Sequence, residues 1–379
     1  MASASDAPLP AMPTASPREF IVTFSTVLGL ILVFLALDLS LARVERAEAL
    51  GHAADLYQEG RAYLDSGQAG EAADRLSAAV SLDRDNLTYA LGLAQAMAAE
   101  GRGPDAEQML GALLDRARND GAVNLTMARL LATTRRPRDA VAFYHRAIYG
   151  QWGADSASQR MAARLELIGQ LVKQHARGEL LAELLPLQSE SADSTALLAR
   201  VAPLYLRAGS PNRAVAAYRA LLQRSPDNVA AYVGMGDGAL AVGKFVTARS
   251  AFRDAARVKA GDTTIVRKLQ LADTLIALDP MARGLDDVQR LRRSRALLAL
   301  TNASVEACAP GVTTQPNLAT RDSARADLRA SLPNKDAASA AERALVLANA
   351  IWRGRPATCV PDSNGSSQVV VLLHRSLTP

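Results

Sequence analysis

"VAAYVGMGDGALAVGKF", Val229 to Phe245, is the stretch of the sequence that decides between two folds. Its segment Gly238–Lys244 fits the first seven places of the phosphate-binding loop G-x-x-x-x-G-K-[ST], which would predict a nucleotide-binding α/β domain. The eighth place of that loop needs a hydroxyl group for magnesium, and Phe245 stands there instead. The loop must also follow a β-strand, whereas residues 225–228, Ser-Pro-Asp-Asn, are typical of a helix start. We therefore expect no nucleotide at this stretch.

Small residues recur at a fixed spacing of 34 positions through the middle of the chain. The first position is occupied by Gly60, Ala94 and Ala128, and further along by Ala202 and Gly236. The second position is occupied by Ala72, Ala106 and Ala140, and further along by Ala214 and Ala248. Such a period is typical of stacked helix pairs, because each pair buries its apolar face only against its neighbours. A Gly or Ala at a fixed place lets the two helices of a pair cross closely.

The residues around these positions resemble the tetratricopeptide repeat family, whose pattern is W-x2-L-G-x2-Y, then A-x3-F, then P. Five units carry the resemblance: 53–86, 87–120, a third unit from 121, 195–228 and 229–262. Examples of matching residues are Leu56, Gly60, Tyr63, Ala72, Leu93, Met127, Tyr144, Leu198, Tyr205, Ala214, Tyr218, Pro226, Tyr232, Gly236, Ala248 and Phe252. The Trp of the family pattern is absent from every unit. After an insertion around 150–153 comes a degenerate unit with Leu165, Ile168, Gly169 and Leu181.

The resemblance implies an all-α solenoid of helical hairpins over 53–280, with about six to seven units, one of them degenerate. In the opening stretch, Gly236 is then the helix-crossing glycine and Gly243 lies in the turn between the two helices of the unit. Lys244 and Phe245 begin the second helix. Composition agrees, since Ala and Leu carry most of the apolar content and only 4% of the residues are aromatic.

An uncharged apolar run, Phe20–Leu37, precedes the repeats. Its length as a helix, about 27 Å, is close to the hydrocarbon thickness of a bilayer. No polar face interrupts it, which disfavours a buried helix of a soluble domain. We expect a transmembrane anchor helix over 19–42 after a disordered tail over 1–18. A cleaved signal peptide is the alternative, with Ala47-Glu-Ala49 as its cleavage site, but that site lies about ten residues beyond the run.

The flanking charges hardly fix the orientation of this anchor, because Arg18 before the run is balanced by Arg43 and Arg46 after it. The two cysteines of the chain, Cys308 and Cys359, mildly favour an exported domain if they pair. We therefore expect a single-pass protein of the inner (cytoplasmic) membrane, with most of the chain on the periplasmic side. Two unrelated buried thiols are the alternative.

A smaller, mostly helical region is expected over 281–379. Its helices are predicted near 285–308, 318–331 and 336–352, and antiparallel packing would bring the ends of the first and third together. Cys308 and Cys359 follow those ends, so they are a candidate disulfide. The arginines at 290, 292, 293 and 295 are interpreted as a solvated helix face, with a surface for an acidic partner or a lipid headgroup as the alternative. The apolar run Val369–Leu373 is expected to form an isolated strand or an extended tail.

Several classes of function find little support in the composition. The formal net charge is +5 and the basic residues form no concentrated tract, so we expect no nucleic acid as a partner. Four scattered histidines and two cysteines offer no metal-binding spacing, and we expect neither metal nor other cofactor nor catalytic residues. An enzyme with a catalytic C-terminal region is the least favoured hypothesis. Its nucleophile and base could only be Cys359 and His374.

The remaining interpretation is a membrane-anchored scaffold for protein–protein interaction, which assembles or holds together an envelope or membrane complex. The resemblance implies that the first helix of each unit lines a partner-binding groove for a helix or extended peptide. The matching positions are Tyr57, Arg61, Leu64, Leu91, Gln95, Leu125, Arg129, Leu206, Val233, Asp237 and Leu240. The alternative is a permanent structural subunit of a large membrane complex, for example a respiratory one. In both cases the lipid bilayer surrounds the anchor, and Thr23, Ser25, Thr26 and Gly29 form a candidate contact face for other membrane helices.

Overall fold

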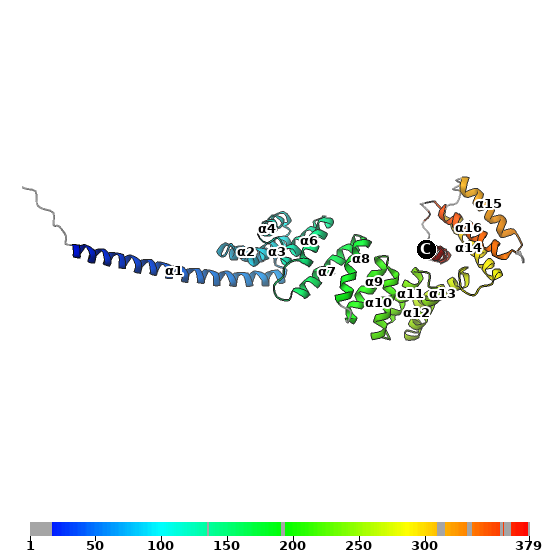
Figure 1. Ribbon diagram of the computed structural model, residues 1–379, viewed down its shortest axis with the longest axis horizontal. Helices are drawn as coiled ribbons and strands as arrows, with labels where there is room; N and C mark the ends of the chain where they lie inside the picture. Colours follow the sequence, from blue (N-terminus) through cyan, green and yellow to red (C-terminus); the bar gives the residue numbers. More distant parts are fainter. Residues whose placement is uncertain are drawn as a thin grey trace, which may run out of the picture. The chain divides into compact units, whose positions relative to one another are not determined.

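The computed structural model describes residues 17–134, 136–190, 194–308, 315–331, 336–356, 359 and 365–377. Over these ranges the chain forms seventeen α-helices and no β-strand, with one isolated bridge between Asp120 and Gln151 (Figure 1). The expected all-α fold is confirmed. Of the predicted tail over 1–18, residues 1–16 lie outside the described residues. The chain divides into two compact units, residues 1–167 and 168–379, which are described separately below.

The first unit is built from successive antiparallel helix pairs (Figure 1). Its helices are α1 (Pro17–Asp65), α2 (Ala69–Leu82), α3 (Leu87–Ala99), α4 (Gly103–Arg116), α5 (Gly121–Thr133) and α6 (Pro137–Tyr149). Helix α7 (Ser156–Lys173) begins in this unit and ends in the second. Helix α1 runs without a break from the apolar segment into the first repeat, where its last turns pack against α2 and α3.

The second unit continues the helix pairs and ends in the C-terminal region. The pairs comprise α8 (Arg177–Glu190), α9 (Thr195–Arg207), α10 (Pro211–Arg224), α11 (Val229–Ala241), α12 (Phe245–Val258) and α13 (Thr263–Leu278). The region after them holds α14 (Asp287–Cys308), α15 (Gln315–Arg329), α16 (Ala337–Arg353) and α17 (Gly365–Leu377).

Local sequence explains where the repeat helices begin and turn. Asn86, Asp120, Asn228 and Asp262 each stand before the first helix of a pair, and their side chains accept hydrogen bonds from backbone N–H groups of its first turn. Between the two helices of several pairs lies a glycine with a positive φ, for example 70° at Gly243. Both features agree with the sequence-based assignment of helix starts and turns.

The close helix crossing is visible at Gly236 of α11. A Cβ atom added to Gly236 would lie 2.3 Å from Cε1 of Phe252 on α12, which is itself fully buried. At the equivalent place in the first pair, a Cβ on Gly60 would lie 2.6 Å from Cγ of Leu76. Ala94, on α3, is fully buried at the same repeat position. Small residues therefore sit where the helices approach most closely, as the 34-residue spacing predicts.

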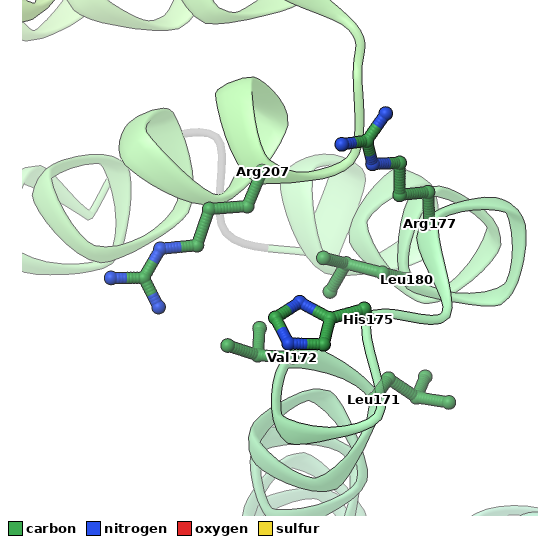
Figure 2. Close-up of a pocket in the computed structure, with 6 residues that line it drawn as sticks. All are labelled: Leu171, Val172, His175, Arg177, Leu180 and Arg207. Carbon is green, nitrogen blue, oxygen red and sulfur yellow. The ribbon is translucent and has the colours of Figure 1, made fainter. Parts of the chain in front are cut away.

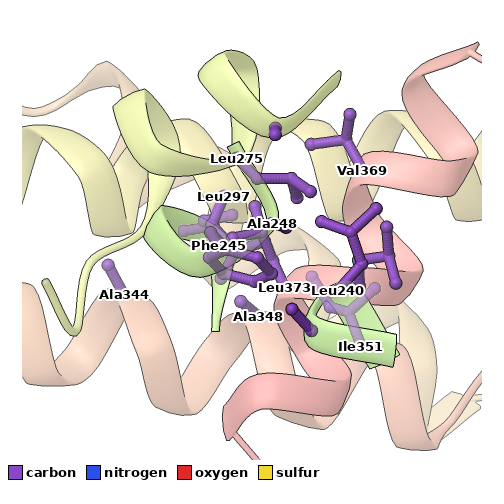
Figure 3. Close-up of a cluster of buried hydrophobic side chains, with 14 of the residues drawn as sticks. Leu240, Phe245, Ala248, Leu275, Leu297, Ala344, Ala348, Ile351, Val369 and Leu373 are labelled. Carbon is purple, nitrogen blue, oxygen red and sulfur yellow. The ribbon is translucent and has the colours of Figure 1, made fainter. Parts of the chain in front are cut away.

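The C-terminal helix α17 contradicts the expectation of a strand or an extended tail. Val370 and Leu373 are fully buried, and Val369 and Leu373 pack in one cluster with Leu240, Phe245 and other apolar side chains (Figure 3). The β-branched run folds as a helix because the helical conformation places its apolar side chains on the face that α11, α13 and α14 cover. Tertiary packing overrides the local β propensity of the valines.

Buried His374 fixes α17 further. Its Nε2 lies 2.8 Å from Oγ1 of Thr301, and its Nδ1 lies 3.1 Å from Oδ1 of Asn349. Its ring stacks on Trp352 with centroids 4.9 Å apart, and the Arg355 guanidinium lies over the ring of Trp352. Burial, with a smaller contribution from Arg355, lowers the pKa of His374 to about 4, so the imidazole is neutral at pH 7.

Two arginines of α14 correct the interpretation of that helix as a solvated face. Arg293 donates to the carbonyl oxygens of Ile276 and Asp279 at the end of α13, at 2.9 and 3.0 Å. Arg295 pairs with Asp327 of α15 at 3.2 Å, and both side chains are mostly buried. These arginines satisfy backbone and carboxylate acceptors of neighbouring helices, so they hold the C-terminal region together.

Replacing Gly236 tests the close crossing. Gly236→Ala should destabilise the fold by about 1–3 kcal/mol, because the added methyl group meets the buried Phe252 ring. Gly169→Ala is the matched control, since Gly169 lies inside α7 with no neighbouring atom within 4 Å of its added Cβ. That control should leave stability unchanged or raise it slightly. Thermal denaturation followed by circular dichroism compares the two, and equal midpoints for Gly236→Ala and wild type would contradict the crossing.

The cysteines permit a second test. Cys359 is buried and disulfide-bonded, while the side chain of Cys308 at the end of α14 lies outside the described residues. We propose that these two residues, the only cysteines of the sequence, pair with each other. Closing that loop would stabilise the fold by about 4 kcal/mol in the chain-entropy model. Peptide mapping without reductant should recover the two cysteines in one linked fragment, and two free thiols would refute the pairing.

Candidate functional site

In the first unit, the predicted groove positions form a polar ladder across successive pairs. The guanidinium of Arg61 on α1 donates to Oε1 of Gln95 on α3 at 2.8 Å, and Gln95 in turn donates to Oγ1 of Thr126 on α5 at 3.2 Å. The rings of Tyr57 and Tyr89 lie against each other at a tilt of 31°, with centroids 4.9 Å apart. Repeat register places Arg61 and Gln95 on this face, but it does not show that they bind each other. Their hydrogen bonds join the repeats.

The other predicted residues of the first unit offer little free surface. Leu91 and Leu125 are buried, and Leu64 packs against the cluster around Leu76. Arg129 makes a bidentate pair with Glu166, at 2.9 and 2.6 Å. This hydrogen bonding raises the pKa of Arg129 against the opposing effect of burial. The charge of Arg129 is therefore already balanced within the chain.

In the second unit, α9 and α11 enclose an open groove with a volume of about 690 Å³, here called the α9–α11 groove. Its lining comprises Pro203, Leu206, Arg207, Tyr218, Val229, Ala230, Val233, Gly234, Asp237 and Lys259. Leu206, Val233 and Asp237 were predicted from the repeat register. Pro203, Arg207 and Lys259 were not, although Pro203 and Arg207 lie on α9 close to Leu206, while Lys259 follows the end of α12.

The floor of this groove depends on a glycine. A Cβ on Gly234 would lie 2.1 Å from Cζ of Tyr218, so only a glycine lets the tyrosine ring reach the surface of α11. Burial, followed by the nearby charge of Asp237, raises the pKa of Tyr218, which keeps the phenol neutral at pH 7. The Tyr218 ring therefore forms an apolar floor between α9 and α11, with its neutral hydroxyl at the edge.

Charges on the groove rim are mostly paired. Asp237 accepts from the ammonium of Lys268 on α13, and Lys259 pairs with Asp262 at 2.9 Å. That Lys259 pair and two backbone N–H groups lower the pKa of Asp262. Arg207 differs, since it is exposed and has no ion-pair or hydrogen-bond partner for its guanidinium in the described ranges. The groove therefore carries one uncompensated positive charge.

Arg207 also lines a second, smaller hollow of about 300 Å³, here called the His175 hollow (Figure 2). Its other lining residues are Leu171, Val172, His175, Arg177 and Leu180. His175 occupies the turn position that is Gly209 in the next pair, and it has a φ of 54°. This left-handed conformation is uncommon for a residue with a side chain. Arg177 is exposed and likewise has no side-chain partner in the part of the chain described.

Leu240, the last predicted groove residue, lies in the core instead. Its side chain is 7% exposed and packs in the cluster that contains Leu373 of α17 (Figure 3). The expected groove position is thus covered by the C-terminal helix of the same chain. Sequence register alone could not predict this, because it carries no information on where α17 packs.

The apolar part of α1 is fully exposed in the structure, and 24–65 is the one described helical stretch long and apolar enough to cross a membrane. On its predicted contact face, the Ser25 hydroxyl donates to the Ile21 carbonyl and that of Thr26 to Val22 at 2.9 Å. The side chain of Thr23 lies outside the described residues, and Gly29 has open space around it. The two hydroxyl groups are therefore hydrogen-bonded within the helix.

The candidate residues for nucleotide binding or catalysis lie in helices, in a turn or in packed side-chain contacts. Gly238 lies inside α11 and Gly243 in the turn before α12, so no strand precedes them. Cys359 is disulfide-bonded and His374 packs against Trp352, as described above. Within the described ranges, no group of three or more His, Cys, Asp or Glu side chains could hold a metal ion.

Comparison with known proteins supports the repeat assignment. A tetratricopeptide repeat family model matches residues 63–130. No curated protein matches the chain. Among solved structures, the chain is similar to Pseudomonas aeruginosa pilF, with 16% identity over 61% of this chain and 99% of that one and a TM-score of 0.39.

Two further solved structures align with similar fractions of this chain. The C-terminal part of a TPR repeat-containing protein from Cytophaga hutchinsonii shares 11% identity over 64% of this chain and 94% of its own, with a TM-score of 0.42. PilW, described as a widely conserved type IV pilus biogenesis factor, shares 16% identity over 57% and 96%, with a TM-score of 0.37.

Proposed function

We propose that this chain, whose residues 63–130 match the tetratricopeptide repeat model, is a membrane-anchored scaffold that binds other proteins. Tetratricopeptide repeats generally mediate protein–protein interaction. The observation that carries the proposal is the α9–α11 groove. It is an open, largely apolar channel on the first helices of two successive pairs, and it lies beside no cluster of metal-binding side chains in the described ranges. Such a surface suits a helix or extended peptide.

The dimensions and continuity of α1 support the anchor. Its apolar segment is exposed along its whole length in the structure, which is costly in water and favourable in lipid. The same helix continues into the first repeat, so about 16 Å of unbroken helix separates residue 42 from residue 53. We propose that α1 holds the first repeat at a short, fixed distance from the bilayer.

We place the protein in the inner membrane, with the repeats on the periplasmic side. The disulfide at Cys359 supports this orientation, because disulfides persist in oxidising compartments. A complex of the cell envelope is then the proposed setting. A permanent structural subunit of such a complex would use the same groove and would also bind other membrane helices through α1.

Site-specific photo-crosslinking tests the groove as a binding surface. A photoreactive phenylalanine analogue at Val233, on the groove wall, should give one discrete adduct in native membranes, because a bound partner lies against that side chain. The matched control is the same analogue at Val246 of α12, which is 62% exposed but does not line the groove. No adduct at Val233, or equal adducts at both positions, would contradict a partner in the groove.

A further inference from the structure

The two hollows of the second unit share one residue, and this arrangement identifies the chemistry of the partner. Arg207, at the last turn of α9, lines both the α9–α11 groove and the His175 hollow. Partly exposed apolar side chains lie on either side of it: Leu206 and Val233 in the groove, and Val172 in the hollow. A partner that occupies both hollows must therefore pass directly over the Arg207 guanidinium.

The charges along this path are unequal. Asp237, the acidic residue of the groove lining, is already paired with Lys268. Lys259 is paired with Asp262. Arg207 and, across the His175 hollow, Arg177 have no compensating carboxylate within the described residues. The groove thus carries paired charges, whereas Arg207 and Arg177, on opposite sides of His175 in Figure 2, have guanidinium groups without a partner in the described residues.

Local sequence explains why the charge of Arg207 stays free. Within a helix, an arginine can pair with a carboxylate three or four residues away. On α9 those places hold Pro203 and Leu204, and beyond the helix end they hold Ser210 and Pro211. By contrast, Arg102 and Arg136, at the turns of earlier pairs, each pair with an aspartate three residues on. The positive charge at Arg207 is accordingly available to a second molecule.

We propose that the partner is an acidic, apolar protein segment. Its apolar side chains would pack on Leu206 and Val233 in the groove and on Val172 in the hollow. Its carboxylate between them would pair with Arg207, with Arg177 as a second cation. Arginine favours carboxylates in such a place because its guanidinium offers two parallel N–H donors. The apolar lining explains why a segment with only acidic residues would not suffice.

This inference rests on the proposed function, since it names the partner of the same groove. The test uses the full-length protein in detergent micelles and three fluorescein-labelled peptides of matched length. The acidic probe is Gly-Ser-Leu-Glu-Leu-Asp-Leu-Glu-Ser-Gly. A neutral probe has Gln and Asn in place of Glu and Asp, and a basic probe has Lys at those places. Fluorescence anisotropy measures the Kd of each at low and at physiological salt.

The acidic peptide should bind at least about tenfold more tightly than the neutral one, and the difference should shrink as salt rises. Arg207→Glu should remove that preference by placing like charges together. Arg219→Glu is the matched control: Arg219 is an exposed arginine of α10 that lines neither hollow, and its reversal changes net charge equally. It should retain the preference for the acidic peptide.

Other outcomes separate the two proposals. If the neutral or basic peptide binds as tightly as the acidic one, or if Arg219→Glu weakens binding as much as Arg207→Glu, the acidic segment is wrong while a protein-binding groove stands. The same holds if no peptide binds although the Val233 crosslink forms. If neither peptide binding nor a Val233 crosslink is found, the proposed function itself fails.

Discussion

The structure depends on the close crossing of the two helices in each pair. Gly60 and Gly236 leave no room for a Cβ atom, and the alanines at equivalent places are fully buried. Because this contact fixes the angle within each pair, it also fixes which face of the first helix stays uncovered. The α9–α11 groove lies on that face of α9 and α11. A larger residue at the crossing would separate the helices and change the groove with them.

Most of the fold could be predicted from the sequence because its signals are local. The small residues at intervals of 34, the Asn and Asp caps and the turn glycine Gly243 all act within one helix pair. The C-terminal helix was missed because Val369 and Val370 favour a strand locally, while the helical conformation comes from contacts with distant helices. Arg293 and Arg295 were misread for the same reason, since their partners lie on α13 and α15.

The candidate site was predicted only in part. Repeat register placed Leu206, Val233 and Asp237 on one face, because register determines the face of a helix on which a residue lies, and all three line the α9–α11 groove. It could not show that Leu240 is covered by α17 or that Arg129 is paired with Glu166, since both depend on long-range packing. Arg207 had a usable signal in the sequence, namely the absence of any acidic residue three or four places away. Its double role in two hollows needed the structure.

The central claim is that α1 holds this chain in a membrane while the repeats bind another protein. Mild detergent extraction of native membranes, followed by sizing of the particle and identification of its components, tests both parts at once. The account predicts that the protein leaves the membrane only with detergent and migrates as a particle larger than the monomer, with a companion at fixed stoichiometry. A protein released without detergent, or a solitary monomer in every extract, would contradict it.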